Sequence, residues 1–355
     1  MVYNFNAGPS ILPKPVFEQA AEAILNFNNT GLSILEIGHR TPVFQAVMDE
    51  ARALVIELMQ LDGDHEVLFL HGGASTQFMQ VPMNLLDEKE TAAFTDTGVW
   101  SAKAIKEAGF FGKTEVVCSS RDEGYSYIPK DFAVPNDARY LHLTTNNTIY
   151  GSQWHKIPLT SNSLVADMSS DIFSRVLNFN SFDLIYAGAQ KNMGAAGVNL
   201  VVVNKNILGK NKRKIPTIMD YRNHIKEGSM LNTPPVFAVY VCMLTLRWLK
   251  LQGGISAIEK QNIKKADLLY GVLDESPLFN GTIQKEDRSK MNICFVMNDP
   301  GLEERFLKFT LAEGIVGIKG HRLVGGFRAS LYNALPLNYV EFLVQLLNEF
   351  TLKNT

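Results

Sequence analysis

Residues 183–203 read DLIYAGAQKNMGAAGVNLVVV, two apolar runs on either side of a turn rich in Gly and Ala. Apolar runs of this length without alternation are typical of strands buried on both faces of a sheet. Similar runs occur at 67–70 and 164–166, and helical patterns occur before the first of these runs, at 43–61, and between the two, at 101–108. Because strands alternate with helices, the sequence predicts an α/β fold with a mostly parallel sheet.

The last third of the chain shows a different pattern. Residues 235–251 read as one helix, with Pro235 in the first turn and two glycines just past the end. A further helix is expected from 255 to about 274, followed by a strand at 291–297 (MNICFVM) and a final amphipathic helix at 339–352. We therefore place a domain boundary near residue 255, which divides the chain into 1–255 and a smaller α+β domain, 256–355.

Composition excludes several classes of protein. With 355 residues, 46% of them apolar and 20% charged, the chain has the make-up of an ordered soluble protein rather than a disordered one. The net charge of −2 supplies no overall positive field, so we expect neither a nucleic-acid nor a membrane partner. The longest apolar stretch, 236–246, is shorter than the roughly 20 residues that cross a bilayer.

Cysteine and histidine usage points to a cytoplasmic protein without a metal. The three cysteines, Cys118, Cys242 and Cys294, are too few and too far apart for a disulfide framework or a CxxC pair. The amino terminus lacks a basic segment followed by an apolar run, so it does not resemble a signal peptide. The histidines show no metal-ligand spacing, and we expect no metal site.

Lys191 lies in the turn of the opening stretch, among Gly188, Gly194 and Gly197. A lysine that is shielded from water has a lowered pKa and becomes a nucleophilic amine, as Schiff-base chemistry requires. The alternative is a surface lysine whose glycines only make the turn. The glycine spacing matches neither GxxxxGK[ST] nor GxGxxG, which removes the main support for a phosphate loop or a dinucleotide site.

Asp167 ends the apolar run of SLVADMSSD, residues 163–171. Ligands of open α/β sheets bind beyond the carboxyl ends of the strands, so Asp167 is expected in that crevice. A carboxylate there can pair with the ring nitrogen of pyridoxal phosphate and keep the ring protonated. By itself such an aspartate is more often a helix cap or a loop ligand. Together with Lys191 it favours the cofactor.

Two further motifs suit the same ligand. HGGAST, residues 71–76, joins a strand to a helical pattern from Gln77, and backbone N–H groups at such a helix start favour a phosphate. Trp100, in TDTGVWS, can lie over a flat ring. The alternatives are a tight turn and a core tryptophan.

Arginines supply candidate sites for anionic substrates. GHR occurs at 38–40 and again at 320–322, and Arg328 follows six residues later. Arginine binds carboxylates and phosphates through two parallel hydrogen bonds, so these groups suit a small polyanion. The alternative, a set of surface ion pairs, would contribute little energy.

Taken together, these motifs resemble the phosphoserine aminotransferase family, class V aminotransferases of pyridoxal-phosphate fold type I. The resemblance covers nearly the whole chain, from NFNAGPSILP at residues 4–13 to KGHRLVGGFRASLYNALP at 319–336, and its most specific elements are AGAQKN, NTPP and KGHR with the following RAS. It implies a large domain with a mostly parallel seven-stranded sheet, a smaller C-terminal α+β domain, and an N-terminal segment, 1–15, packed on that smaller domain.

The resemblance also implies how pyridoxal 5′-phosphate is held. Lys191 would bind it covalently and move a proton between the substrate and the cofactor, and Asp167 would pair with the ring nitrogen. Trp100 would stack on the ring, and Thr148, in TNNTIYG, would bond the phenolic oxygen. The cofactor phosphate would be held by Ala74, Ser75 and Gln190 and by the neighbouring subunit's copies of Asn232 and Thr233. Some family members carry an arginine where this chain has Ser75, which leaves that contact open.

A homodimer with shared active sites follows from the same resemblance. The substrate would be bound by His39 and Arg40 from one subunit and by His321, Arg322 and Arg328 from the other. The implied reaction is reversible amino transfer from L-glutamate to 3-phosphohydroxypyruvate, giving O-phospho-L-serine and 2-oxoglutarate, in L-serine biosynthesis. Bacterial members also serve pyridoxine biosynthesis through 4-phosphohydroxy-L-threonine, and the sequence leaves that activity open.

Three alternatives compete with this hypothesis. A cysteine desulfurase needs a reactive cysteine in a mobile loop, whereas Cys294 lies in an alternating strand pattern; a glyoxylate transaminase is the other rival on the same fold. A binding protein that kept only the fold would be expected to lack Lys191 or Asp167. A nicotinamide dehydrogenase would need GxGxxG after a strand, and the sequence contains none.

Overall fold

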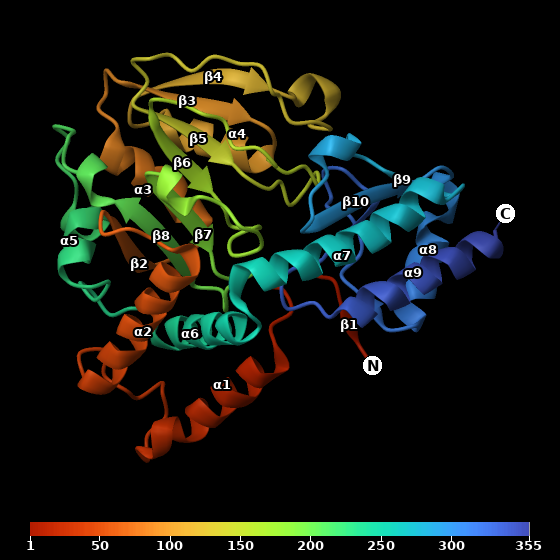
Figure 1. The fold of residues 1–355 in the computed structure, drawn as a ribbon, viewed down its shortest axis with the longest axis horizontal. Coiled ribbons are helices and arrows are strands. Elements are labelled where there is room, and N and C mark those ends of the chain that lie inside the picture. The colour runs from red at the N-terminus through yellow and green to blue at the C-terminus, as the bar shows by residue number, and fades with distance from the viewer. Residues whose placement is uncertain (355) are drawn as a thin grey trace.

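A seven-stranded sheet forms the centre of the larger part of the computed structural model, which describes residues 1–354 (Figure 1). Within the sheet only β8 runs antiparallel to its neighbours. The prediction of a mostly parallel α/β sheet is therefore confirmed. In sheet order the strands are β2 (His65–His71), β8 (Val198–Asn204), β7 (Leu184–Gly188), β6 (Ser163–Asp167), β5 (Tyr140–Thr144), β3 (Thr91–Asp96) and β4 (Lys113–Ser119).

Helices cover both faces of this sheet, which is why β2, β6, β7 and β8 contain continuous apolar runs. In β2, Val67 and Phe69 enter one core, while Leu68 and Leu70 enter the core on the opposite face. The first core is closed by α1 (Lys14–Asn26), α2 (Pro42–Met59) and α6 (Val236–Leu251), and the second by α3 (Ala74–Leu85), α4 (Val99–Ala108) and α5 (Tyr221–Lys226).

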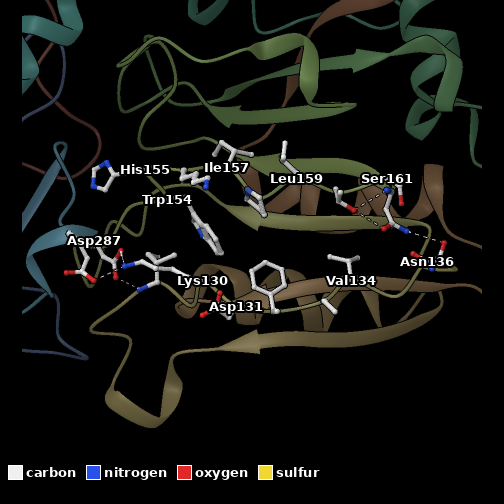
Figure 2. A pocket seen from close by; sticks show the side chains of 18 residues that line it. Lys130, Asp131, Val134, Asn136, Trp154, His155, Ile157, Leu159, Ser161 and Asp287 are labelled. Carbon is white, nitrogen blue, oxygen red and sulfur yellow. Dashed lines mark hydrogen bonds and ion pairs between the residues drawn. The ribbon is translucent and has the colours of Figure 1, made fainter.

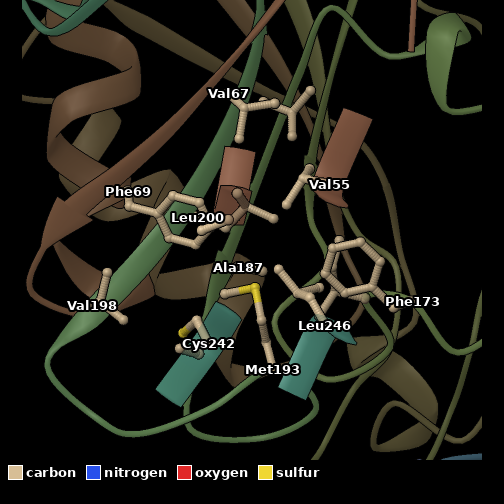
Figure 3. Close-up of a cluster of buried hydrophobic side chains, with 14 of the residues drawn as sticks. Val55, Val67, Phe69, Phe173, Ala187, Met193, Val198, Leu200, Cys242 and Leu246 are labelled. Carbon is tan, nitrogen blue, oxygen red and sulfur yellow. The ribbon is translucent and has the colours of Figure 1, made fainter. Parts of the chain in front are cut away.

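Figure 3 shows how closely the first core packs. Val55 of α2 lies toward Val67 of β2 and Leu200 of β8, Leu246 of α6 lies beside Phe173 and Met193, and Cys242 lies in the same cluster. A Cβ on Gly194, in the turn after Lys191, would lie 2.7 Å from the Cys242 sulfur. The small residue at this position therefore lets the turn pack against α6.

The C-terminal part has its own sheet and core. Strands β9 (Phe279–Gly281), β10 (Asn292–Met297) and β12 (Phe327–Ser330) form an antiparallel sheet with β10 in the centre. This sheet packs with α8 (Glu303–Ala312) and α9 (Leu337–Leu352), as Figure 1 shows in blue. The helices predicted at 255–274 and 339–352 and the strand at 291–297 are confirmed within two residues at each end.

Helix α7 (Gly254–Glu275) joins the two parts, because Ile255 and Ile258 lie in the first core and its later residues in the C-terminal core. At the amino terminus, β1 (Tyr3–Asn4) pairs with β11 (Ile315–Val316), and Phe5 lies in the C-terminal core. The division at residue 255, with segment 1–15 on the smaller domain, stays a prediction.

Among the helices of residues 1–354, none by itself is long and apolar enough to span a membrane. Helices α6 and α7 together reach that length and composition, but the chain bends by 81° between them.

Candidate active site

The predicted cofactor residues meet at one edge of the large sheet. Strands β2, β3, β5, β6 and β7 all point the same way, so their carboxyl ends and the segments that follow lie at the same edge. A cavity of about 120 Å³ opens there. Its lining includes all the residues that the resemblance assigned to the cofactor in this chain, namely Ala74, Ser75, Trp100, Thr148, Asp167, Gln190 and Lys191.

Lys191 lies three residues beyond the end of β7, half-buried in the cavity wall. Its Nζ donates a hydrogen bond to Thr148 Oγ1 at 2.8 Å. Burial, with a smaller effect of the Arg328 charge, lowers the pKa of the ammonium to about 8, although the Asp167 carboxylate opposes the shift. A larger fraction of the amine is therefore unprotonated near neutral pH than for a free lysine, which makes it a nucleophile.

Residues 8–10 contact the backbone and the side-chain stem of this lysine. Ser10 N–H donates to the Gln190 carbonyl at 3.0 Å, and the Ser10 hydroxyl donates to the carbonyl of Lys191. A Cβ on Gly8 would lie 3.4 Å from Lys191 Cγ, so the segment follows the lysine stem closely. These contacts restrict the direction in which the amine can point.

Asp167 is the last residue of β6 and only 5% exposed. One of its oxygens accepts the backbone N–H of Ser169 at 2.9 Å. Burial raises the pKa of the carboxyl group, and the hydrogen bonds from Ser169 and the charge of Lys191 act in the opposite direction. A buried carboxylate at this position would be stabilised by a cation in the cavity, as a protonated pyridine nitrogen would be.

Two unpartnered polar groups in the cavity wall test whether a flat, polar cofactor fits. Trp100 Nε1 and Thr144 Oγ1 are buried and lack a hydrogen-bond partner within residues 1–354. Such groups are costly unless a ligand or water satisfies them. The Trp100 ring centroid lies 5.9 Å from Lys191 Nζ, so a ring joined to the amine could reach the indole. The residues present therefore fit pyridoxal phosphate.

Helix α3 begins in the cavity wall at Ala74, three residues before the start that the sequence indicated. Gly73 occupies the cap position, and no side chain caps this end of the helix. Backbone N–H groups in the first turn, at Ala74 and Ser75, are therefore available to an anion. The earlier start brings both predicted phosphate-binding residues into the first helical turn.

A second cavity, of about 200 Å³, contains two of the predicted substrate residues, His321 and Arg328. Arg328 Nη1 donates to the Thr148 carbonyl at 3.1 Å, while Arg328 Nε has no partner within residues 1–354. Thr148 thus contacts both the amine of Lys191 and the guanidinium of Arg328. The loop that carries His321 is closed by Gly320 N–H donating to the Gly326 carbonyl at 2.8 Å. A Cβ on Gly320 would overlap the carbonyl of Gly325, so this loop requires glycine.

Other predicted residues lie outside both cavities. Arg40 and Arg322 are exposed, and His39 is half-buried with an unpartnered Nε2. Thr233 is exposed, and its carbonyl accepts the ring N–H of His71 at 2.5 Å, while the neighbouring Asn232 is half-buried. A single chain therefore does not bring these residues to Lys191, and their assignment to a shared site stays a prediction.

The sequence analysis missed part of the cavity wall. Thr144 is the last residue of β5 and Asn146 follows the strand, in the run TTNNT, and Ser170 follows Asp167. A cluster of small polar residues at the end of a strand could have indicated this part of the wall. The strand β5 itself is hard to predict, because the buried His142 interrupts it and it does not read as an apolar run.

A larger cavity, of about 840 Å³, lies elsewhere and contains none of the predicted site residues. Figure 2 shows Trp154 between the segment of Lys130 and Val134 and the segment of Ile157 and Leu159. The charge of Lys130 is compensated, because its Nζ lies 2.8 Å from Glu286 Oε1 and 3.3 Å from Asp287 Oδ1.

Both a family model and curated proteins match nearly the whole chain. The family model for aminotransferase class-V matches residues 2–343. Among curated proteins, phosphoserine aminotransferase of Flavobacterium johnsoniae is 57% identical over 346 residues, covering 97% of each chain. The phosphoserine aminotransferase of Parabacteroides distasonis is 53% identical over 350 residues and covers 98% of each chain.

Solved structures of the same kind superpose closely. Phosphoserine aminotransferase from Bacillus circulans subsp. alkalophilus matches with a TM-score of 0.97 and 43% identity, covering 100% of this chain and 99% of that one. A phosphoserine aminotransferase from Trichomonas vaginalis, with pyridoxal phosphate bound, matches with a TM-score of 0.93 and 34% identity, covering 98% of this chain and all of the other.

Proposed function

The chain belongs to the aminotransferase class-V family, as a pyridoxal-phosphate-dependent transaminase of fold type I, and from this we propose that it has phosphoserine aminotransferase activity. It would transfer an amino group reversibly from L-glutamate to 3-phosphohydroxypyruvate, giving O-phospho-L-serine and 2-oxoglutarate. The observation that carries the proposal is the position of Thr148, which joins the amine of Lys191 to the guanidinium of Arg328. A nucleophilic amine and an arginine that can bind an anion thus donate hydrogen bonds to the same residue.

Pyridoxal phosphate supplies an electron sink that stabilises negative charge at the substrate α-carbon. Lys191 would hold the cofactor covalently and, once displaced by a substrate amine, accept and return a proton at its Nζ. Its lowered pKa suits this role, because an amine that is partly unprotonated near neutral pH can act both as base and as acid.

The remaining cavity residues would orient the cofactor. Asp167 would keep the ring nitrogen protonated, since a buried carboxylate gains most from a cation beside it. Trp100 would cover the ring face, and Thr148 would bond the phenolic oxygen. The start of α3, at Ala74 and Ser75, would bind the phosphate together with Gln190, which lies in the same cavity wall.

Substrate anions would bind at the second cavity, beside Arg328 and His321. Arg328 retains unused donors, and His321 lies in the same cavity. The two substrates use the site in turn, and each carries a carboxylate at one end and a second anionic group at the other. A cluster of arginine and histidine side chains can bind both.

We also propose a homodimer with shared active sites. His39, Arg40, Asn232 and Thr233 lie outside the cavity of their own chain, and two of them are exposed. Apolar side chains are exposed nearby in sequence, with Phe17 at 53% and Leu25 at 82%, which a second copy would cover. The predicted roles in cytoplasmic L-serine biosynthesis and, through 4-phosphohydroxy-L-threonine, in pyridoxine biosynthesis belong to the same proposal.

Absorption spectroscopy with both substrates tests the proposal. The purified protein, loaded with pyridoxal phosphate, should lose its visible absorption band when L-glutamate is added and regain it with 3-phosphohydroxypyruvate. Glyoxylate and L-cysteine serve as the matched alternatives. Recovery of the band with glyoxylate but not with 3-phosphohydroxypyruvate would replace the proposal with glyoxylate transamination. Formation of L-alanine from L-cysteine, with the sulfur transferred to a protein thiol as a persulfide, would indicate a desulfurase.

A further inference from the structure

Lys103 is a cation that does not belong to the predicted cofactor or substrate residues. It lies on α4 three residues after Trp100, a spacing that places both side chains on one face of the helix. Its Nζ lies 4.4 Å from the centroid of the Trp100 ring. Because Trp100 forms part of the cofactor cavity, the ammonium stands at the edge of the candidate active site.

No carboxylate neutralises this ammonium within residues 1–354. Lys103 is exposed, and Glu107, one turn further along α4, forms no ion pair with it. An exposed contact between an ammonium and an indole is weak and easily exchanged for a contact with an anion. The side chain therefore remains available for a ligand.

The charge of Lys103 also acts on a predicted substrate residue. The pKa of His321 is lowered by burial first and then by the positive charges of Arg328, Arg322 and Lys103. His321 lines the second cavity together with Arg328. Lys103 thus influences this imidazole, although it comes from a helix of the large sheet and His321 from a loop of the C-terminal part.

We propose that Lys103 contacts the phosphate group of the phosphorylated substrate and sets the preference for it over 2-oxoglutarate. This inference rests on the proposed function. At pH 8 a phosphate monoester carries about two negative charges and the distal carboxylate of 2-oxoglutarate carries one. Coulomb energy is proportional to the product of the charges, so one ammonium stabilises the phosphate about twice as strongly at the same distance.

The test compares the two oxo acids as acceptors for the same aminated enzyme. Lys103→Met is measured against Lys106→Met, which removes another exposed lysine from the next turn of α4. The second-order rate constant of Lys103→Met should fall about tenfold with 3-phosphohydroxypyruvate and about threefold with 2-oxoglutarate. The interaction energy with the carboxylate is about half of that with the phosphate, so the expected fold-change is about the square root of ten. Lys106→Met should change both by less than about twofold, and Lys103→Arg should retain most of the preference.

The outcomes separate this inference from the proposed function. If the unmodified enzyme does not aminate 3-phosphohydroxypyruvate, the proposed function is wrong and Lys103 loses its ligand. If the unmodified enzyme is active but Lys103→Met loses equally with both oxo acids, or behaves like Lys106→Met, the inference about Lys103 is wrong and the proposed function stands. Cofactor content, measured from the visible band, should be equal in all variants.

Discussion

Of two cavities in this protein, the smaller one has the features of a binding site, and the larger one does not. The cavity of Lys191 measures about 120 Å³, and the cavity of Trp154 about 840 Å³. The small one lies at the carboxyl ends of parallel strands, and burial shifts the pKa of both its lysine and its aspartate. The large one lies between two connecting segments, where the charge of Lys130 is compensated by Glu286 and Asp287.

This difference shows that shifted pKa values and unpartnered polar atoms, rather than volume, identify the candidate site. Shifted pKa values and unsatisfied polar atoms converge on the small cavity, which is the arrangement expected where a ligand completes the structure. In the large cavity Trp154 Nε1 is also unpartnered, but the lysine near it already has partners. Substitutions in the two cavities should therefore have very different effects on turnover.

Removing the amine should have the largest effect on turnover. Lys191→Ala should reduce transamination below detection, because neither covalent attachment of the cofactor nor proton transfer at Nζ remains possible. The readouts are the steady-state rate and the visible band. The matched control is Lys156→Ala, an exposed lysine of the large cavity, which should keep full activity. Activity in Lys191→Ala close to that of Lys156→Ala would overturn the assignment of the lysine.

Neutralising the buried carboxylate should have the next largest effect. Asp167→Asn keeps the shape of the side chain but cannot hold a ring nitrogen protonated, so kcat should fall by about 10²–10³-fold. Most of the cofactor should remain bound, since its other contacts persist. Measuring kcat together with cofactor content separates the two effects, and an unchanged kcat would contradict the role given to Asp167.

The lowered pKa of Lys191 predicts how cofactor capture depends on pH. Capture by the cofactor-free protein requires the unprotonated amine, so its rate should rise about tenfold per pH unit below pH 8 and level off above it. An unshifted lysine would show a continued rise to beyond pH 10. Stopped-flow absorbance between pH 6 and about 10 distinguishes the two curves.

Truncating Trp154 should have the smallest effect on turnover and a large one on stability. The side chain is 3% exposed in the first core, and its loss should cost about 3–5 kcal/mol of the free energy of unfolding. Per folded molecule, kcat should stay within about twofold, because Trp154 lines the large cavity and is not part of the wall of the Lys191 cavity. Chemical denaturation and active-site titration measure the two quantities. A fall in kcat with unchanged stability would reverse the ranking of the two cavities.

Much of the fold was predictable because its signals are local. The strands β2, β6, β7 and β8 are buried on both faces and read as apolar runs, and α2, α6, α7 and α9 show helical periodicity and suitable ends. Strand β4 was missed because it pairs only with β3 at the edge of the sheet, where Val116 is 47% exposed and the sequence KTEVVCS is partly polar. Strand β2, at the opposite edge, is buried on both faces and keeps its apolar run, whereas β4 is partly exposed and carries no strong apolar pattern.

Local sequence also predicted which residue types stand at the candidate site, because a lysine in a small-residue turn and an aspartate at a strand end are recognisable without any partner. It did not reveal that Thr148 contacts both Lys191 and Arg328, or that the charge of Lys103 acts on His321. Contacts of this kind depend on how distant strands pair and how the C-terminal part packs against the sheet. Strand pairing and packing are properties of the whole chain, so only the tertiary structure decides which charges share a site.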